Sequence, residues 1–172
     1  MTAKAKRKKK MSPAKRNLYV DIGLLGVFLV TLAPDLTGLT IHEWLGYALG
    51  GAILTHLILH WKWLVATTKR FFGKMNRQQR INYAMTFALL GAFLGTGLTG
   101  LLMSDTLGLG IGGDLLEDVH EAGANVSMLL VGGHLVLHTK WLWNNAKRYL
   151  IPKPVIKALE PALAPVRINK RK

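Results

Sequence analysis

The sequence predicts an all-α membrane protein: a four-helix transmembrane bundle built from two repeated helical hairpins, with the N and C termini in the cytoplasm. Three observations lead to this prediction. The 172-residue chain combines 50% hydrophobic residues with a formal net charge of +14, which suits a membrane protein whose charges lie outside its apolar segments. Four such apolar segments are present, and the second half of the chain repeats the first.

Each of the four apolar segments is a candidate membrane span. A hydrocarbon core of about 30 Å needs about 17 to 25 apolar residues in a helix. The first segment is marginal in length, with Asp21 and Pro34 near its ends, and the other three are long enough. We expect all four to cross the plasma (inner) membrane in a multi-pass protein. The segments are 18–33, 41–67, 81–103 and 119–143.

The distribution of charge predicts the orientation. Lys and Arg number eight in 1–16, five in 67–80 and eight after residue 143, whereas 34–40 and 104–118 contain none. By the positive-inside rule both termini and the middle loop face the cytoplasm. The opposite, outer end is predicted to be acidic, because it gathers Asp35, Glu43, Asp105, Asp114, Glu117, Asp118 and Glu121.

The chain therefore divides into a basic cytoplasmic arm (1–16), a four-helix transmembrane domain (17–148) and a basic cytoplasmic tail (149–172). We interpret the arm as a solvated topology anchor that contacts anionic lipid rather than as a nucleic-acid patch. The first apolar run follows basic residues, as in a signal peptide, but it has a counterpart in the second hairpin. We therefore expect it to stay uncleaved.

An internal repeat organises the transmembrane domain into repeat 1, about 17–67, and repeat 2, about 81–145. Segment 42–64 aligns with 120–142 at a constant offset of 78 residues. The helix before each segment starts near an asparagine, Asn17 or Asn82, and is expected to close on Thr-Gly-Leu. Such repeats usually form pseudo-symmetric elements around one shared site. All six histidines fall into matched pairs: His42 with His120, His56 with His134, and His60 with His138.

The spacing of the histidines predicts which face they share. Fourteen residues turn a helix by about 1400°, so His42 and His56 lie on one face about 21 Å apart along the axis, with His60 on the same face about 27 Å from His42. The second and fourth spans run in the same direction, so matched histidines lie at equal depth. This arrangement can hold a cofactor between the two helices.

The residue types restrict the cofactor. The chain has no cysteine, which excludes thiolate sites and covalent c-type haem attachment. Ionisable groups inside a bilayer are costly and usually functional, and imidazole binds metals. Zinc prefers four tetrahedral ligands, whereas two opposed imidazoles at each of two levels suit bis-histidine haem. Close approach of a macrocycle or of another backbone is expected at Gly46, Gly50, Gly51, Gly123, Gly132 and Gly133.

A histidine with a second one 14 residues later, repeated on a parallel helix, resembles the transmembrane cytochrome b and ferric-reductase-like di-haem proteins. Over about 17–145, the Thr-Gly-Leu, HEWLG and HLILHWKW motifs are similar to those of small bacterial four-helix proteins of the domain-of-unknown-function 4405 family. The resemblance implies two non-covalent b haems that carry electrons across the membrane. By position it implies that His42 and His120 are the axial iron ligands of an outer haem, and His56 and His134 those of an inner haem.

His60 and His138 lie about 6 Å along the axis from His56 and His134, too close for a third stacked haem. We expect them to neighbour the inner haem without ligating it. Three roles remain open: contact with the haem propionates alongside Lys62 and Lys140, a quinone pocket shared with Asp21, or placement at the inner interface. The tryptophans expected at that interface are Trp61, Trp63, Trp141 and Trp143.

The predicted function is therefore electron transport by a b-type cytochrome that exchanges electrons with a quinol or a partner redox subunit. A basic redox protein docking at the acidic outer face is a further expected partner. No nucleotide-binding fingerprint is present, which favours an electron-transfer subunit of a quinol- or metal-reductase over a complete enzyme. The alternative is a non-redox membrane subunit, either a scaffold of a larger complex or a divalent-cation permease.

Overall fold

The computed structural model describes residues 11–71, 73 and 75–151, and these residues form helices and connecting segments without a strand. Most of the expected basic arm and tail lie outside the described residues. Four helices are long, and a fifth, of four residues, was not predicted. They are α1 Pro13–Thr31, α2 Pro34–Thr37, α3 Leu39–Phe71, α4 Arg77–Met103 and α5 Asp114–Tyr149.

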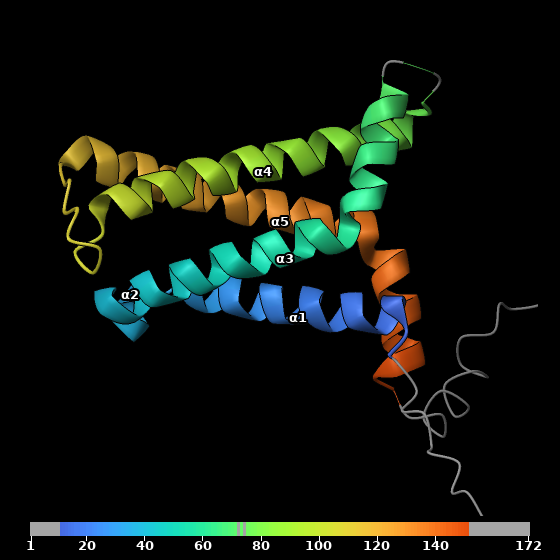
Figure 1. Ribbon diagram of the computed structural model, residues 1–172, viewed down its shortest axis with the longest axis horizontal. Helices are drawn as coiled ribbons and strands as arrows, with labels where there is room; N and C mark the ends of the chain where they lie inside the picture. Colours follow the sequence, from blue (N-terminus) through green and yellow to red (C-terminus); the bar gives the residue numbers. More distant parts are fainter. Residues whose placement is uncertain (1–10, 72, 74, 152–172) are drawn as a thin grey trace, which may run out of the picture.

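The long helices pack as two hairpins, as the repeat predicts. α1 lies along α3, and α4 lies along α5, each pair antiparallel (Figure 1). The histidine-bearing helices α3 and α5 run in the same direction, and both bend near their C-terminal ends (Figure 1). Their most buried residues, Leu49 and Ser127, occupy matched positions of the repeat, 78 residues apart. The two hairpins are therefore alike in how their histidine helices face the rest of the bundle.

Local sequence explains where the helices begin. Ser12 caps α1 by accepting a hydrogen bond from the Lys15 amide at 3.3 Å, and Pro13 follows at the first helical position, where its missing N–H costs nothing. Asn76 and Gln79 form a capping box at the start of α4, which pairs two otherwise free amides. At Gly38 a positive φ of 82° breaks the chain between α2 and α3, a conformation that glycine adopts most readily.

The two hairpins differ at the end that carries α2 and the 104–113 loop, called the acidic end below. The first Thr-Gly-Leu spans the junction of α2 and α3. The expectation that this motif closes the first helix is wrong, because α1 ends earlier, at Thr31. The second lies inside α4. The connection after α4 is irregular only over 104–113, shorter than expected, because α5 already begins at Asp114.

A carboxylate at the acidic end joins the two hairpins. Glu43 of α3 accepts hydrogen bonds from the Ser104 hydroxyl at 2.9 Å and from the Thr106 amide at 3.1 Å. Tyr47, one turn further along α3, bonds the same Ser104 hydroxyl at 2.5 Å. The loop of the second hairpin is thus fixed to the histidine helix of the first.

The surface of the bundle suits an apolar solvent. Two described helices, α3 and α4, are long and apolar enough to cross a membrane by length and composition. Large apolar side chains such as Leu36, Ile58 and Leu129 are 88%, 65% and 73% exposed, an outward-facing apolar surface that a bilayer covers. Both described ends lie at the end opposite α2 (Figure 1), where the Ser12 and Tyr149 hydroxyls are 3.1 Å apart.

Candidate functional site

His42 and His120, the pair nearest the acidic end, face each other across the two hairpins. Their ring centroids are 6.1 Å apart, with the ring planes at 77°. The Nδ1 of His42 lies 2.8 Å from the Thr31 carbonyl oxygen, and the Nδ1 of His120 lies 3.0 Å from the Thr96 carbonyl oxygen. A carbonyl only accepts, so in both rings Nδ1 carries the proton and Nε2 keeps its lone pair. Both rings are ready to bind a metal through Nε2.

His42 and His120 are called the outer pair below. The groups that hydrogen-bond their rings come from the neighbouring helix of each hairpin. Thr31 is the last residue of α1, where helix carbonyls have no partner within the helix, so its oxygen is free for His42. His120 also lies 3.1 Å from the Thr99 hydroxyl. A Cβ on Gly100 would lie 2.9 Å from the His120 Cε1, so the ring has its present place because residue 100 has no side chain.

The next pair, His56 and His134, is called the inner pair below, and its two rings have unequal surroundings. The His56 Nδ1 lies 2.8 Å from an Asp21 carboxylate oxygen contributed by α1. A carboxylate oxygen accepts a hydrogen bond, so Nδ1 of His56 carries the proton and Nε2 again keeps its lone pair. The Nδ1 of His134 is buried and has no hydrogen-bond partner among the described residues. One ring is held by a charged group, and its repeat counterpart is not.

The rings of His60 and His138 lie against those of the histidines one turn before them, with the ring planes tilted by 36° and 45°. The ring centroids of His56 and His60 are 4.6 Å apart, and those of His134 and His138 are 4.5 Å apart. The buried Nε2 of His60 has no hydrogen-bond partner among the described residues and lies 4.0 Å from the Asp21 oxygen that bonds His56. Asp21, His56 and His60 thus form one cluster, with a ligand atom of each within 4.8 Å of the others.

The glycines divide into two groups. A Cβ would meet no atom within 4 Å at Gly46, Gly50, Gly51 or Gly132. Gly123 and Gly133 instead lie against α4, where a Cβ would meet Thr96 or Met85. These two glycines therefore serve close packing inside the second hairpin. Gly46, one turn after His42, has open space where its Cβ would lie.

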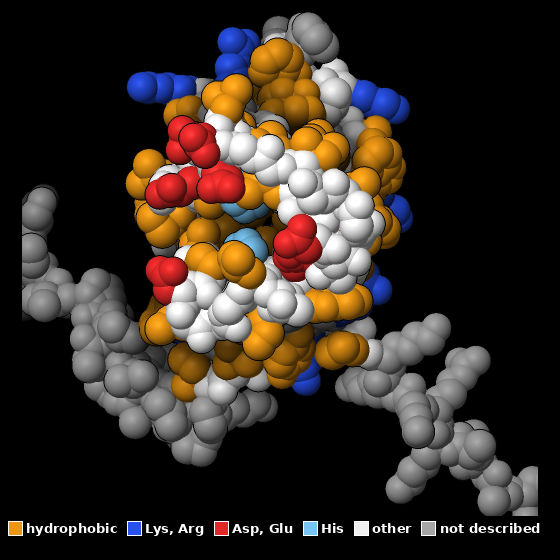
Figure 2. Space-filling model, turned by 90° about the vertical axis from the view of Figure 1, so that its left-hand side faces the viewer, with side chains coloured by type: hydrophobic (Ala, Val, Ile, Leu, Met, Phe, Trp, Pro, Cys, Tyr) orange, Lys and Arg blue, Asp and Glu red, His pale blue; other side chains and the backbone are white. Residues whose placement is uncertain are grey.

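The acidic end opens toward the outer histidines. Figure 2 views the bundle from this end and shows acidic side chains around a hollow in which histidine side chains are visible. The histidines nearest this end in the sequence are His42 and His120. A group bound between them would be reached from this end through an acidic rim.

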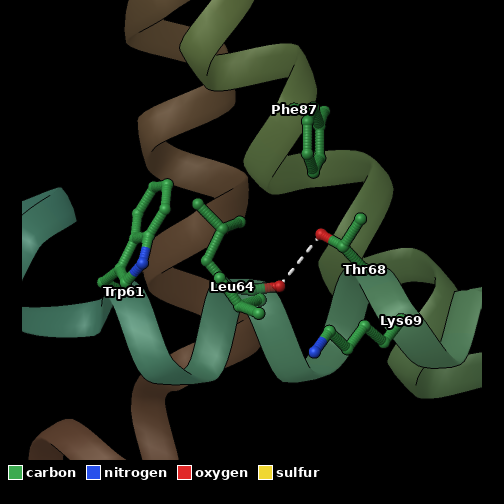
Figure 3. Close-up of a pocket in the computed structure, with 6 residues that line it drawn as sticks. Trp61, Leu64, Thr68, Lys69 and Phe87 are labelled. Carbon is green, nitrogen blue, oxygen red and sulfur yellow. Dashed lines mark hydrogen bonds between the residues drawn. The ribbon is translucent and has the colours of Figure 1, made fainter.

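A separate pocket of about 370 Å³ is lined by residues of α3 and α4. Trp61, Leu64 and Thr68 of α3 line it together with Phe87 of α4, and the Thr68 hydroxyl bonds the Leu64 carbonyl within the helix (Figure 3). Its walls are apolar and include no histidine. It is not the histidine site.

The outer pair fits a bis-histidine metal. Two metal–nitrogen bonds of about 2 Å, together with the two ring radii, put the centroids of opposed imidazoles about 6 Å apart, and the observed separation is 6.1 Å. Metal-binding histidines usually donate their other nitrogen to a carbonyl or carboxylate, as His42, His120 and His56 do. Two opposed ligands between apolar helices suit the flat ring of haem.

Comparison with known proteins gives one family match. Residues 4–150 match the family model of prokaryotic cytochrome b561. The chain belongs to the prokaryotic cytochrome b561 family. No curated protein and no solved structure gives a significant match.

Membership of the cytochrome b561 family identifies the chain as a haem-binding transmembrane protein of electron transport. The expected cytochrome b relationship is confirmed at this level, and the family that matches is cytochrome b561 rather than the narrower family of unknown function. b-type haem is its cofactor, and the described bundle provides histidine pairs suited to that group.

Several residues of the site were not predicted from the sequence. Thr31 and Thr96 act through backbone carbonyls, which carry no sequence signal. Thr99 and Gly100 belong to the repeated Thr-Gly-Leu motif, which marked the repeat but was not connected to His120. Asp21 was considered only as part of a quinone pocket, one of three open roles, and its hydrogen bond to His56 was not predicted.

Proposed function

We propose that this cytochrome b561 carries electrons across the plasma membrane through two b haems, one bound by His42 and His120 and the other by His56 and His134. The observation that carries this proposal is the outer pair, whose rings are 6.1 Å apart with both Nδ1 atoms held by carbonyls. The 78-residue repeat extends the same arrangement to the inner pair. A b haem held at each level would supply one-electron transfer between the ferric and ferrous states of its iron.

The other residues of the site hold the histidine ligands in position and form their surroundings. The carbonyls of Thr31 and Thr96 fix the tautomer and direction of the outer ligands, and Asp21 does so for His56. The rings of His60 and His138 lie against the inner ligands and restrict the inner ring positions without themselves binding iron.

In the proposed topology all four long helices span the bilayer, with both termini in the cytoplasm. α1 and α5 pack antiparallel along α3 and α4, the two helices that qualify as spans, so each would cross together with its partner. The acidic end is then the outer end, because the positive-inside rule puts the basic connections inside. An inner partner, a quinol or a redox subunit, and a basic redox protein at the acidic end would exchange the electrons.

The divalent-cation alternative finds its best ligands in Asp21, His56 and His60, whose ligand atoms lie within 4.8 Å of one another. In the structure, however, Asp21 already accepts a hydrogen bond from Nδ1 of His56, and the family is one of cytochromes. Electron transport through haem is therefore favoured over a permease or a scaffold.

The experiment is a reduced-minus-oxidised spectrum with a haem-to-protein ratio for the purified full-length protein in detergent. We expect two b haems for each chain. His42→Ala should remove one haem and His56→Ala the other, while His60→Ala should keep both as the matched control one turn away. A colourless protein after haem-sufficient expression would contradict the proposal, and retention of both haems in His56→Ala with loss of one in His60→Ala would move the inner ligand to His60.

A further inference from the structure

We propose that Asp21 is a positioning residue for the inner ligand His56 and that its charge lowers the potential of the inner haem. The inference rests on the proposed two-haem function and deepens it, because it names the group that acts on the inner ligand and the direction of its effect.

The contact that carries the inference is short and crosses between helices. Asp21 lies in α1, and its Oδ1 accepts a hydrogen bond from Nδ1 of His56 in α3, with the two atoms 2.8 Å apart. The side chains are 22% and 27% exposed, so the pair is largely shielded. Asp21 is also isolated from the other acids, since every other Asp and Glu among the described residues lies at the acidic end or in the α2 segment. Its field therefore acts mainly on the inner level.

The second hairpin offers no equivalent group. Counted from the matched asparagines Asn17 and Asn82, the residue corresponding to Asp21 is Thr86, whose hydroxyl bonds the Asn82 carbonyl of its own helix at 2.9 Å. His134, the partner of His56, keeps a buried Nδ1 with no bond among the described residues. The inner level thus has one carboxylate support, whereas the outer level has two neutral carbonyl supports.

The sign of the effect follows from the charge of the iron. Ferric iron in a haem carries one more positive charge than ferrous iron, and a nearby carboxylate stabilises the more positive form. A carboxylate on the second nitrogen of the ligand also makes the imidazole a stronger donor, which favours the ferric state as well. Both effects lower the potential, and both are strongest in a dry interior. Lys62 and Lys140 are exposed, so solvent screens their opposing effect.

The test is Asp21→Asn in the full-length protein, followed by a spectroscopic redox titration of both haems. The amide oxygen can still accept the His56 proton, so the substitution removes the charge and keeps the hydrogen bond. We expect the ferrous-to-ferric ratio of the inner haem at a fixed ambient potential to rise about tenfold, which is about 59 mV for a one-electron couple. The outer haem should not change, and the haem ratio should stay at two.

Three control variants assign the signals. His42→Ala leaves the inner haem and His56→Ala the outer haem, so each potential is measured alone. Asp35→Asn makes the same chemical change in α2 and should shift neither inner nor outer potential. If Asp21→Asn loses the inner haem, Asp21→Glu restores the charge and should restore both the haem and its low potential.

The outcomes separate this inference from the proposed function. Two haems in the wild type with no inner shift in Asp21→Asn, or with an equal shift of both haems, would overturn the role of Asp21 and leave the two-haem proposal intact. Failure of Asp21→Glu to restore a lost haem would overturn it too. A wild-type protein with fewer than two haems would overturn the proposed function itself and this inference with it.

Discussion

The outer and inner histidine pairs hold the same residues at the same repeat spacing, yet their supports differ. In the outer pair each Nδ1 bonds a backbone carbonyl of the neighbouring helix, at 2.8 and 3.0 Å. In the inner pair one Nδ1 bonds a carboxylate and the other has no partner among the described residues. In the proposed two-haem arrangement both levels require two imidazoles, which would account for the shared histidines, while the groups behind them would set each site's potential. The repeat thus retains the histidines and varies their supports.

The largest effect on this comparison is expected from Gly100→Ala. The new Cβ would lie 2.9 Å from the His120 Cε1, closer than a Cβ packs, so the outer ring must move. Overpacking of this kind costs about 1–3 kcal/mol, which we expect to fall on haem affinity. The haem-to-protein ratio should drop from two toward one, with the inner haem spectrum unchanged.

Gly97→Ala is the matched control in the same helix, since its Cβ would meet nothing within 4 Å. It should keep both haems. Equal haem loss in the two variants would mean that Gly100 is needed for α4 itself and not for the His120 ring.

A smaller effect is expected from Glu43→Gln at the acidic end. The substitution weakens the charge-assisted bonds to the Ser104 hydroxyl and the Thr106 amide, which contribute more than neutral bonds. Amide hydrogen exchange at 104–113 should accelerate about tenfold, because a loss of about 1.4 kcal/mol in local stability changes the open population by that factor. Both haems should remain.

The repeat supplies the control for this loop as well. Glu121 occupies the position of Glu43 in the second hairpin and has no side-chain hydrogen bond among the residues that the structure describes. Glu121→Gln should leave exchange in the loop unchanged. If it accelerates exchange equally, the general negative charge of this end, and not the Glu43 contacts, stabilises the loop.

The hairpins and the outer pair were largely predictable from the sequence. Periodicity and the 78-residue offset predicted the hairpins, the parallel course of α3 and α5, and the meeting of His42 with His120, because hydropathy and side-chain spacing follow helix geometry directly. The early end of α1 was missed, because the continuing apolar sequence hides the break at 32–33. That break frees the Thr31 carbonyl for His42, so the same error concealed the support.

The inner pair shows a different limit. Asp21 was noticed as a charge in an apolar segment, but its partner depends on the rotation of α1 against α3, which packing sets and a single sequence does not reveal. The clash that a Cβ on Gly100 would make with His120 likewise depends on how closely α4 approaches α5. Residue types thus indicated the cofactor, whereas interhelical contacts determine the surroundings of each ligand.

The smallest expected effect is that of Thr99→Val, and it asks which acceptor holds His120. The Nδ1 proton lies between the Thr96 carbonyl at 3.0 Å and the Thr99 hydroxyl at 3.1 Å. The hydroxyl donates to carbonyls of its own helix, Gly95 and Thr96, so it is a weaker acceptor than the carbonyl, which remains in the variant.

A neutral hydrogen bond contributes about 0.5–1.5 kcal/mol in total, and only the part that differs between ferric and ferrous iron shifts the potential. The outer haem of Thr99→Val should therefore shift by less than about 30 mV, and the inner haem not at all. Thr86→Val, which removes a hydroxyl bonded within its own helix near the inner level, is the control. An outer shift as large as that expected for Asp21→Asn would make the Thr99 hydroxyl the main support of His120, and the outer pair would then be as unequal as the inner one.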